Sequence, residues 1–321
     1  MSGRTWPGWR AGRRLAAGAA AAAALALGGC GLGPGEEPAT PVSLTVTSDF
    51  GGRALLRRPE AEVSGADTVM RVTQRNAKVT TRFGGDFVQT IGGLSGGRRD
   101  GRPYDWFIYL DGVLTSEGAG GLRVTGGERI WWDHHDWGLT PDVPAVVGSF
   151  PEPFLHGADG RPVKLQCDPA QRAACDTVAA RLDRVGVEAD LGPLRRADRD
   201  GSLRIAVGTW TALRGGTPEA RSVDQGPKSS GVFARFGDDG ASLSLLDPRG
   251  GVAKRLGGEA GLVGATRQPG RPPMWFVTGT DAAGVAAAAD AFDEPVLHNR
   301  FAVATSGNLP LSVPLPAADG P

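Results

Sequence analysis

Two aromatic segments and the Asp-Gly pair between them constrain the fold of this chain more than any other feature. Residues 105–110 read DWFIYL, Asp111-Gly112 follows, and residues 130–137 read IWWDHHDW. An Asp-Gly pair beside β-prone residues is a strong signal for a tight hairpin turn. Side chains alternate between the two faces of a strand. The two segments therefore predict strands that carry large rings on both faces.

The flanking patterns complete a small domain. Residues 42–51 alternate apolar and polar side chains with β-branched residues, which is typical of a half-buried strand. A short helix is expected over residues 68–79, after the cap-like pair Asp67-Thr68. Another hairpin is expected to turn at Gly126-Gly127. Strands around one short helix predict a small α+β domain over residues 42–150.

The pattern changes after a linker at residues 151–162. Phe150 and Phe154, in the proline-rich segment that leads into this linker, are expected to pack between two domains. Over residues 163–308 strands alternate with helices, one from Pro169 to about Val185 and one rich in alanine. This alternation predicts an α/β domain with a mixed sheet. The proline-rich residues 309–321 are expected to form a disordered tail. The predicted fold class of the whole chain is α+β.

The N-terminus has the pattern of an export signal. Four arginines precede an apolar run from Leu15 to Leu27, which is too short to cross a bilayer as a mature helix. Residues 27–30, Leu-Gly-Gly-Cys, resemble the bacterial lipobox, in which the cysteine becomes the lipidated first residue. We therefore expect a signal peptide over residues 1–30, a lipid on Cys30 and a flexible tether over residues 31–41. The expected location is the outer face of the cell membrane.

Export also bears on the two remaining cysteines. In an oxidising compartment Cys167 and Cys175 are expected to form a disulfide that closes a short loop. Such a bond stabilises a fold by roughly 2 to 3 kcal/mol. A zinc site is the alternative, but this cysteine spacing fits no usual zinc motif.

The charge balance argues against a nucleic-acid partner. The chain has 35 basic and 35 acidic residues and a net charge of zero. Phosphate backbones are bound by clustered, unopposed Lys and Arg side chains. We therefore expect no nucleic-acid partner, and no sequence pattern calls for a cofactor.

The two adjacent histidines point to opposite faces if residues 130–137 form a strand. Trp131, Asp133 and His135 then share one face, whereas Trp132 and His134 share the other. Histidines on opposite faces cannot bind one metal ion, so no metal site is expected. The Gly-x-Ser-x-Gly sequence around Ser95 lacks the following helix that a nucleophile elbow needs, so no enzyme is expected.

Two interpretations of the cluster remain open. In the first, its side chains pack inside the domain and the histidines bond nearby carboxylates or backbone. In the second, the rings outnumber what a small domain can bury and form a platform for a flat organic ligand. The ligand-binding residues would then be Trp106, Tyr109, Trp131, Trp132, His134, His135 and Trp137, with Asp133 and Asp136 holding the histidines.

A family resemblance joins these segments. Four short motifs resemble the signature of the transcobalamin-like C-terminal domain family. They are Trp106, the turn Asp111-Gly112-Val113, the pair Gly118-Ala119, and residues 126–131, which lead into the second aromatic strand. The resemblance covers about residues 42–140. It implies a cobalamin-facing β-domain or a bacterial surface lipoprotein that serves vitamin uptake. Asp111 replaces the usual Asn, and the helical domain that covers the other side of cobalamin in the carriers is absent.

These features predict a lipid-anchored binding protein that captures cobalamin or a similar flat ligand. Its expected partner is a membrane transporter of the energy-coupling-factor type, which such vitamin uptake uses. The alternative is a surface module that binds another protein or the cell wall through its aromatic residues.

Overall fold

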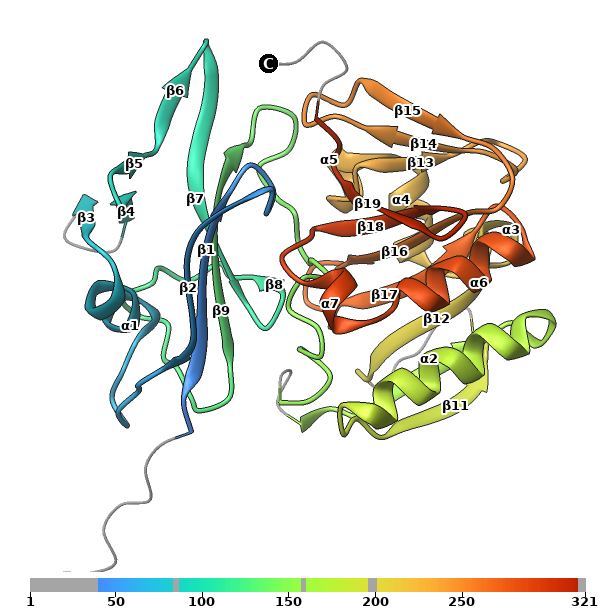
Figure 1. The fold of residues 1–321 in the computed structure, drawn as a ribbon, viewed down its shortest axis with the longest axis horizontal. Coiled ribbons are helices and arrows are strands. Elements are labelled where there is room, and N and C mark those ends of the chain that lie inside the picture. The colour runs from blue at the N-terminus through green and yellow to red at the C-terminus, as the bar shows by residue number, and fades with distance from the viewer. Residues whose placement is uncertain (1–39, 83–86, 157–159, 196–200, 317–321) are drawn as a thin grey trace, which may run out of the picture. The chain divides into compact units, whose positions relative to one another are not determined.

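The computed structural model describes residues 40–82, 87–156, 160–195 and 201–316 (Figure 1). Residues 38–321 belong to one compact unit. The expected signal peptide, the lipid site at Cys30 and nearly all of the tether lie outside the described residues. The architecture combines sheets with few helices, so the predicted α+β fold class is confirmed.

The first sheet has the strand order β2-β1-β9-β7-β6, and the short β8 also pairs with β7 (Figure 1). Its strands are β1 (Val42–Ser48), β2 (Arg53–Ala61), β6 (Gly97–Arg99), β7 (Arg102–Leu110), β8 (Val113–Leu114) and β9 (Arg129–Asp136). β9 is a central strand, parallel to β1 and antiparallel to β7. The two aromatic segments therefore lie side by side in the middle of the sheet.

The predicted turn at Asp111-Gly112 is confirmed. Both residues have positive φ angles, 52° and 78°, between β7 and β8. The hairpin expected at Gly126-Gly127 is wrong, because the chain before these glycines bonds to the start of a helix instead. The amide of Val69 donates to the carbonyl of Leu122, and the amide of Val124 donates to the carbonyl of Asp67.

A helix, α1 (Val69–Asn76), packs against this sheet where a helix was expected. Thr68 caps it by accepting a hydrogen bond from the amide of Arg71. Val69 and Val72 join a core with Leu44, Ile130 and Trp132. A small antiparallel sheet of β3 (Val79–Arg82), β4 (Phe87–Ile91) and β5 (Leu94–Ser95) lies beside it.

The second sheet has the order β11-β10-β12-β17-β16-β18-β19. Its strands are β10 (Val163–Cys167), β11 (Ala189–Pro193), β12 (Leu203–Thr209), β16 (Ala260–Thr266), β17 (Met274–Gly279), β18 (Ala302–Ser306) and β19 (Leu309–Val313). The first four strands in this order are parallel and the remaining pairs are antiparallel, so the sheet is mixed as predicted. Residues 309–313 were expected in a disordered tail, but they form β19 because they pair along the whole of β18.

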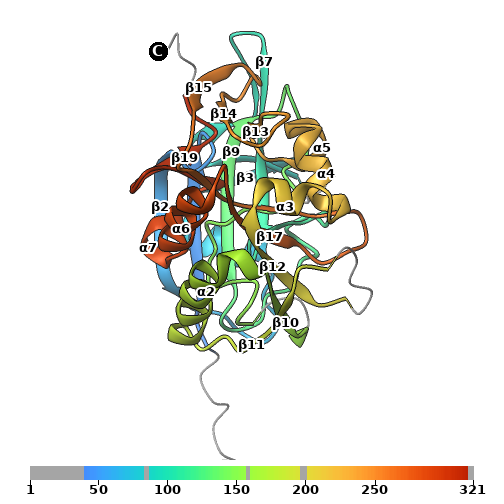
Figure 2. The same ribbon diagram turned by 90° about the vertical axis from the view of Figure 1, so that its right-hand side faces the viewer.

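Helices cover both faces of this sheet (Figure 2). On one face α2 (Arg172–Arg184) and α6 (Ala282–Ala291) pack over Leu165, Ile205 and Val277. The other face carries α3 (Trp210–Arg214), α4 (Pro218–Asp224), α5 (Pro227–Ser230) and the sheet of β13 (Ala234–Phe236), β14 (Leu243–Leu246) and β15 (Val252–Leu256). Asp281 caps α6 by accepting from the amide of Gly284 at 2.8 Å.

The predicted disulfide is present between Cys167 and Cys175. Cys167 ends β10, and Cys175 lies in the first turn of α2, fully buried. A 3-10 turn, η3 (Pro169–Gln171), connects the two elements. The bond therefore closes the sharp passage from the sheet to its covering helix.

The two sheets share hydrophobic cores. Phe50 and Trp131 of the first part lie in one core cluster with Phe301, which precedes β18. As expected, Phe150 and Phe154 also pack against the second part, with Phe154 4.9 Å from Trp275 between ring centroids. The backbones of the two parts approach closely at Gly148. A Cβ atom there would lie 2.6 Å from the amide nitrogen of Arg300, so a larger residue does not fit.

Candidate binding site

The aromatic strand β9 is almost completely buried. Trp131 exposes 2 % of its surface, Trp132 1 % and His135 1 %, while Tyr109 and His134 expose none. Trp106 is also buried. The predicted alternation is confirmed, because Trp131 and His135 contact Phe301 on one side while Trp132 bonds Thr73 of α1 on the other.

His135 belongs to a closed polar network. Its Nδ1 lies 2.8 Å from Oδ2 of Asp133, as expected for a carboxylate that holds a histidine. The Asp133 carboxylate also accepts hydrogen bonds from the hydroxyl of Thr47 and from the amides of Phe50 at 3.1 Å and Gly51 at 2.9 Å. The imidazole stacks on Phe50 at 4.4 Å and on Phe107 at 4.2 Å between ring centroids. This network ties β9 to the turn after β1.

His134 and Asp136 have separate partners. Nε2 of His134 lies 3.0 Å from the carbonyl oxygen of Ser95, and burial lowers the pKa of His134. Asp136 was expected to hold a histidine, but it forms an ion pair with Arg102 of β7. The two histidines therefore lie in different environments and share no ligand.

The expectation of an uncovered aromatic platform is wrong for these rings. Trp137, which exposes 37 % of its surface, is the exception. The rings on the Trp131 face are covered by Phe301 and Phe50, which come from distant parts of the chain. An estimate that treats the first domain alone can include Phe50 but not Phe301. The roles of these residues in ligand binding remain predictions.

A different part of the molecule has a cavity of ligand size. A cleft of about 750 Å³ lies beside the Asp111-Gly112 turn and the loop after β16. Small-molecule sites in proteins typically enclose about 300 to 1,000 Å³. We call this cavity the charged cleft, because its lining includes Asp111, Glu117, Glu128, Arg161, Arg267 and Arg271.

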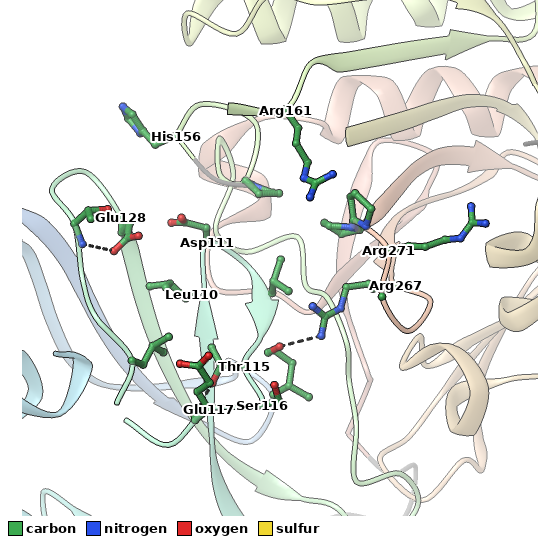
Figure 3. A pocket seen from close by; sticks show the side chains of 18 residues that line it. Leu110, Asp111, Thr115, Ser116, Glu117, Glu128, His156, Arg161, Arg267 and Arg271 are labelled. Carbon is green, nitrogen blue, oxygen red and sulfur yellow. Dashed lines mark hydrogen bonds between the residues drawn. The ribbon is translucent and has the colours of Figure 1, made fainter. Parts of the chain in front are cut away.

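The charges in the charged cleft are segregated. Figure 3 shows Asp111, Glu117 and Glu128 on segments of the first sheet and the three arginines across the cavity from them. Within the part of the chain that the structure describes, no ion pair joins these two groups. Arg267 instead donates to the carbonyl oxygen of Leu114 at 3.1 Å. The cleft therefore offers hydrogen-bond acceptors on one wall and donors on the other.

Asp111 is the most perturbed acid of the charged cleft. It exposes 6 % of its surface, and its Oδ1 accepts a hydrogen bond from the amide of Arg129 at 2.8 Å. Burial raises the pKa of Asp111 to about 7, and Glu152 and Glu128 add to the rise by repulsion. At neutral pH this side chain can therefore act as a donor or an acceptor.

Sequence reasoning located the Asp111-Gly112 turn but missed the cleft. Two of the three arginines, Arg267 and Arg271, come from residues 267–273, a loop rich in Pro and Gly between β16 and β17. Arg161 lies just before β10. The two arginines close to prolines in the 267–273 loop were the one sequence feature that could have indicated a binding site there. Nothing local in the sequence places this loop opposite Glu117.

The fold and the cavity thus define an α+β protein with a ligand-sized cleft and without a recognisable catalytic constellation in the residues described above. The family model for a domain of unknown function, DUF4430, matches residues 66–136. This match lies inside the region that resembles the transcobalamin-like domain and contains the acidic wall of the charged cleft. No curated protein matches the chain.

The described ranges contain no group of three or more His, Cys, Asp or Glu side chains that could hold a metal ion. Among the helices described in Figure 1, none is long and apolar enough to cross a membrane.

Proposed function

We propose that this chain is a lipid-anchored, exported binding protein that captures cobalamin or a similar flat ligand, one edge of which lies in the charged cleft. The ligand would be passed to a membrane transporter, and the lipid on Cys30 would hold the protein at the outer face of the membrane. The chain would perform no chemistry on its ligand. The transcobalamin-like resemblance supports this role, and the charged cleft supplies a place for the ligand.

One observation carries the proposal: acidic and basic walls face each other across a cavity of about 750 Å³. Charged side chains that face one another without pairing favour a guest with both donors and acceptors. Charge-assisted hydrogen bonds to such a guest are stronger than bonds between neutral groups.

Cobalamin is the first ligand to test. Its corrin ring carries a rim of amides, whose NH₂ groups can donate to Glu117 and Glu128 while their carbonyls accept from Arg271. The cleft would take one edge of this ligand. This differs from the stacking arrangement expected for Trp131 and Trp132, whose rings are buried.

The test is a spectral titration of the mature chain with cobalamin. A shift of the corrin absorbance that saturates is the expected result. Glu117→Ala and Arg271→Ala should each weaken binding about tenfold, because each loses a charge-assisted hydrogen bond. Glu60→Ala and Arg255→Ala are matched controls, since both residues are exposed and do not line the cleft. Equal affinities for all four variants would refute the proposed location of the site.

A second candidate function is a surface module that binds another protein. Trp137 exposes 37 % of its surface beside a shallow hollow lined by Arg98, Pro103 and Tyr104. Exposed tryptophans with an arginine nearby are common anchors of protein interfaces. No change in the corrin spectrum up to high micromolar cobalamin would favour this function over the first.

A further inference from the structure

A second cavity lies in the α/β part, separate from the charged cleft. It has a volume of about 280 Å³ and covers β10 and β12 on the sheet face that carries α3. Its lining includes Gln166, Leu194, Arg195, Thr211, Leu213 and Met274. These residues come from two strands, β10 and β17, from the chain just after β11 and from α3.

The strand order places this cavity at a switch of chain direction. The chain leaves β10 toward α2, which packs on the sheet face of Leu165. It leaves β12 toward α3, which packs on the opposite face with Ala206. β10 and β12 are parallel neighbours, so the connections diverge at their carboxyl ends. In open α/β sheets, ligands bind in the crevice at this kind of divergence.

Gln166 provides an independent sign of a ligand. It is the next-to-last residue of β10 and exposes 3 % of its surface. Its Oε1 atom is buried and has no hydrogen-bond partner among the residues that the structure describes. A buried acceptor without a donor destabilises a fold, and a ligand N–H or O–H in the cavity would remove that cost.

The other residues that line the cavity limit the kinds of ligand that can bind there. Leu194, Leu213 and Met274 form an apolar surface, and Arg195 is an exposed cation at the same cavity. Arg195 has no ion pair among the residues that the structure describes. A guest that satisfies all these groups needs a donor, an apolar body and an anionic group.

We propose that this cavity binds a small apolar carboxylate that carries an adjacent donor, that is, an α-amino or α-hydroxy acid with an apolar side chain. The donor would bond Oε1 of Gln166, the carboxylate would pair with Arg195, and the side chain would lie against Leu213 and Met274. The cavity of about 280 Å³ has room for a guest of this size. This site does not depend on the function proposed for the charged cleft.

The mature chain offers a specific probe for this site. Downstream of Cys30 the sequence has two methionines, Met70 and Met274. Met274 lines the cavity, whereas Met70 belongs to α1 and packs in the core under the first sheet. With ¹³C-methyl methionine, titration with L-leucine should move the Met274 signal and leave the Met70 signal unchanged.

Two analogues separate the contributions of the donor and the carboxylate. 4-Methylpentanoate keeps the carboxylate and lacks the donor, whereas 3-methylbutylamine keeps the ammonium and lacks the carboxylate. Both should bind at least about tenfold more weakly than L-leucine, because each leaves one polar group of the site unpaired. No movement of the Met274 signal with any of the three up to about 10 mM would overturn the proposal.

Variants test the two polar residues. Arg195→Ala should weaken L-leucine binding about tenfold, and the exposed Arg221→Ala, outside the cavity, should leave it unchanged. Gln166→Leu should abolish the preference for L-leucine over 4-methylpentanoate without lowering the melting temperature, because it removes an unpaired acceptor. A preference that persists in Gln166→Leu would overturn the role of Gln166, and full affinity in Arg195→Ala would overturn that of Arg195.

Discussion

Nδ1 of His135 lies 2.8 Å from Oδ2 of Asp133, and neither side chain exposes more than 1 % of its surface. Asp133 accepts three further hydrogen bonds, whereas Nε2 of His135 is buried and has no partner in the described part of the chain. The pair therefore has unequal members. Asp133 organises the turn after β1, and His135 mainly fills the space between two phenylalanine rings.

This asymmetry predicts different costs for the two substitutions. Asp133→Ala should lower the free energy of unfolding by about 3 to 5 kcal/mol, because it leaves several buried donors unpaired. His135→Phe should cost less than half as much, since a phenyl ring can occupy the same stack and three donors to Asp133 remain. Urea denaturation measures both, with Asp183→Ala on the exposed side of α2 as a control. Equal costs would show that the imidazole is as important as the carboxylate.

The raised pKa of Asp111 predicts a dependence of stability on pH. Because the folded chain holds this proton up to about pH 7 and a free aspartate loses it near 3.8, this carboxyl makes the fold less stable as pH rises between these values. Asp111→Asn cannot ionise, and Asn tolerates the positive φ of this turn. The variant should therefore gain roughly 2 kcal/mol over the native chain when the pH is raised from 5 to 7.

Urea denaturation at several pH values tests this gain. The difference between Asp111→Asn and the native chain should grow as the pH rises to about 7 and then level off. A difference that is constant from pH 5 to 8 would mean that Asp111 does not titrate in this range.

Removal of the disulfide should destabilise the α/β part. Replacing both Cys167 and Cys175 by Ser should lower the free energy of unfolding by about 2 to 3 kcal/mol, the value for closing a loop of this length. Unfolding of the native chain in the presence of dithiothreitol should give the same loss. The double variant should show no further loss with reductant, and any such loss would point to a different cause.

Tryptophan fluorescence tests the burial of the aromatic strand. Among the six tryptophans downstream of Cys30, Trp137 is exposed by 37 %, whereas the other five expose 8 % or less. Trp137→Phe should therefore remove most of the emission that acrylamide quenches. Trp106→Phe, the matched control, should leave the quenchable fraction nearly unchanged. Strong quenching that remains in Trp137→Phe would mean that the rings of β9 are accessible.

Local patterns predicted the elements well. The features that were predicted correctly depend on residues close together in the chain. They are the strand β9, the Asp111-Gly112 turn, the capped helices α1 and α6, and the disulfide. The tail after residue 309 was missed because its strand pairs with β18, and a proline-rich sequence gives no sign of such a partner. The prediction of a hairpin at Gly126-Gly127 was wrong for the same reason, because β9 pairs in parallel with the distant strand β1.

The candidate sites show the limit of sequence more clearly. The sequence by itself determined which rings lie on each face of β9, because side chains of a strand alternate. It also determined the Asp111-Gly112 turn, because few residues accept a positive φ. Only the tertiary structure decided that Phe301 covers Trp131, that residues 267–273 face Glu117 and that Gln166 lines a pocket. These are contacts between residues far apart in the chain, and periodicity and turn propensity carry information only about neighbours.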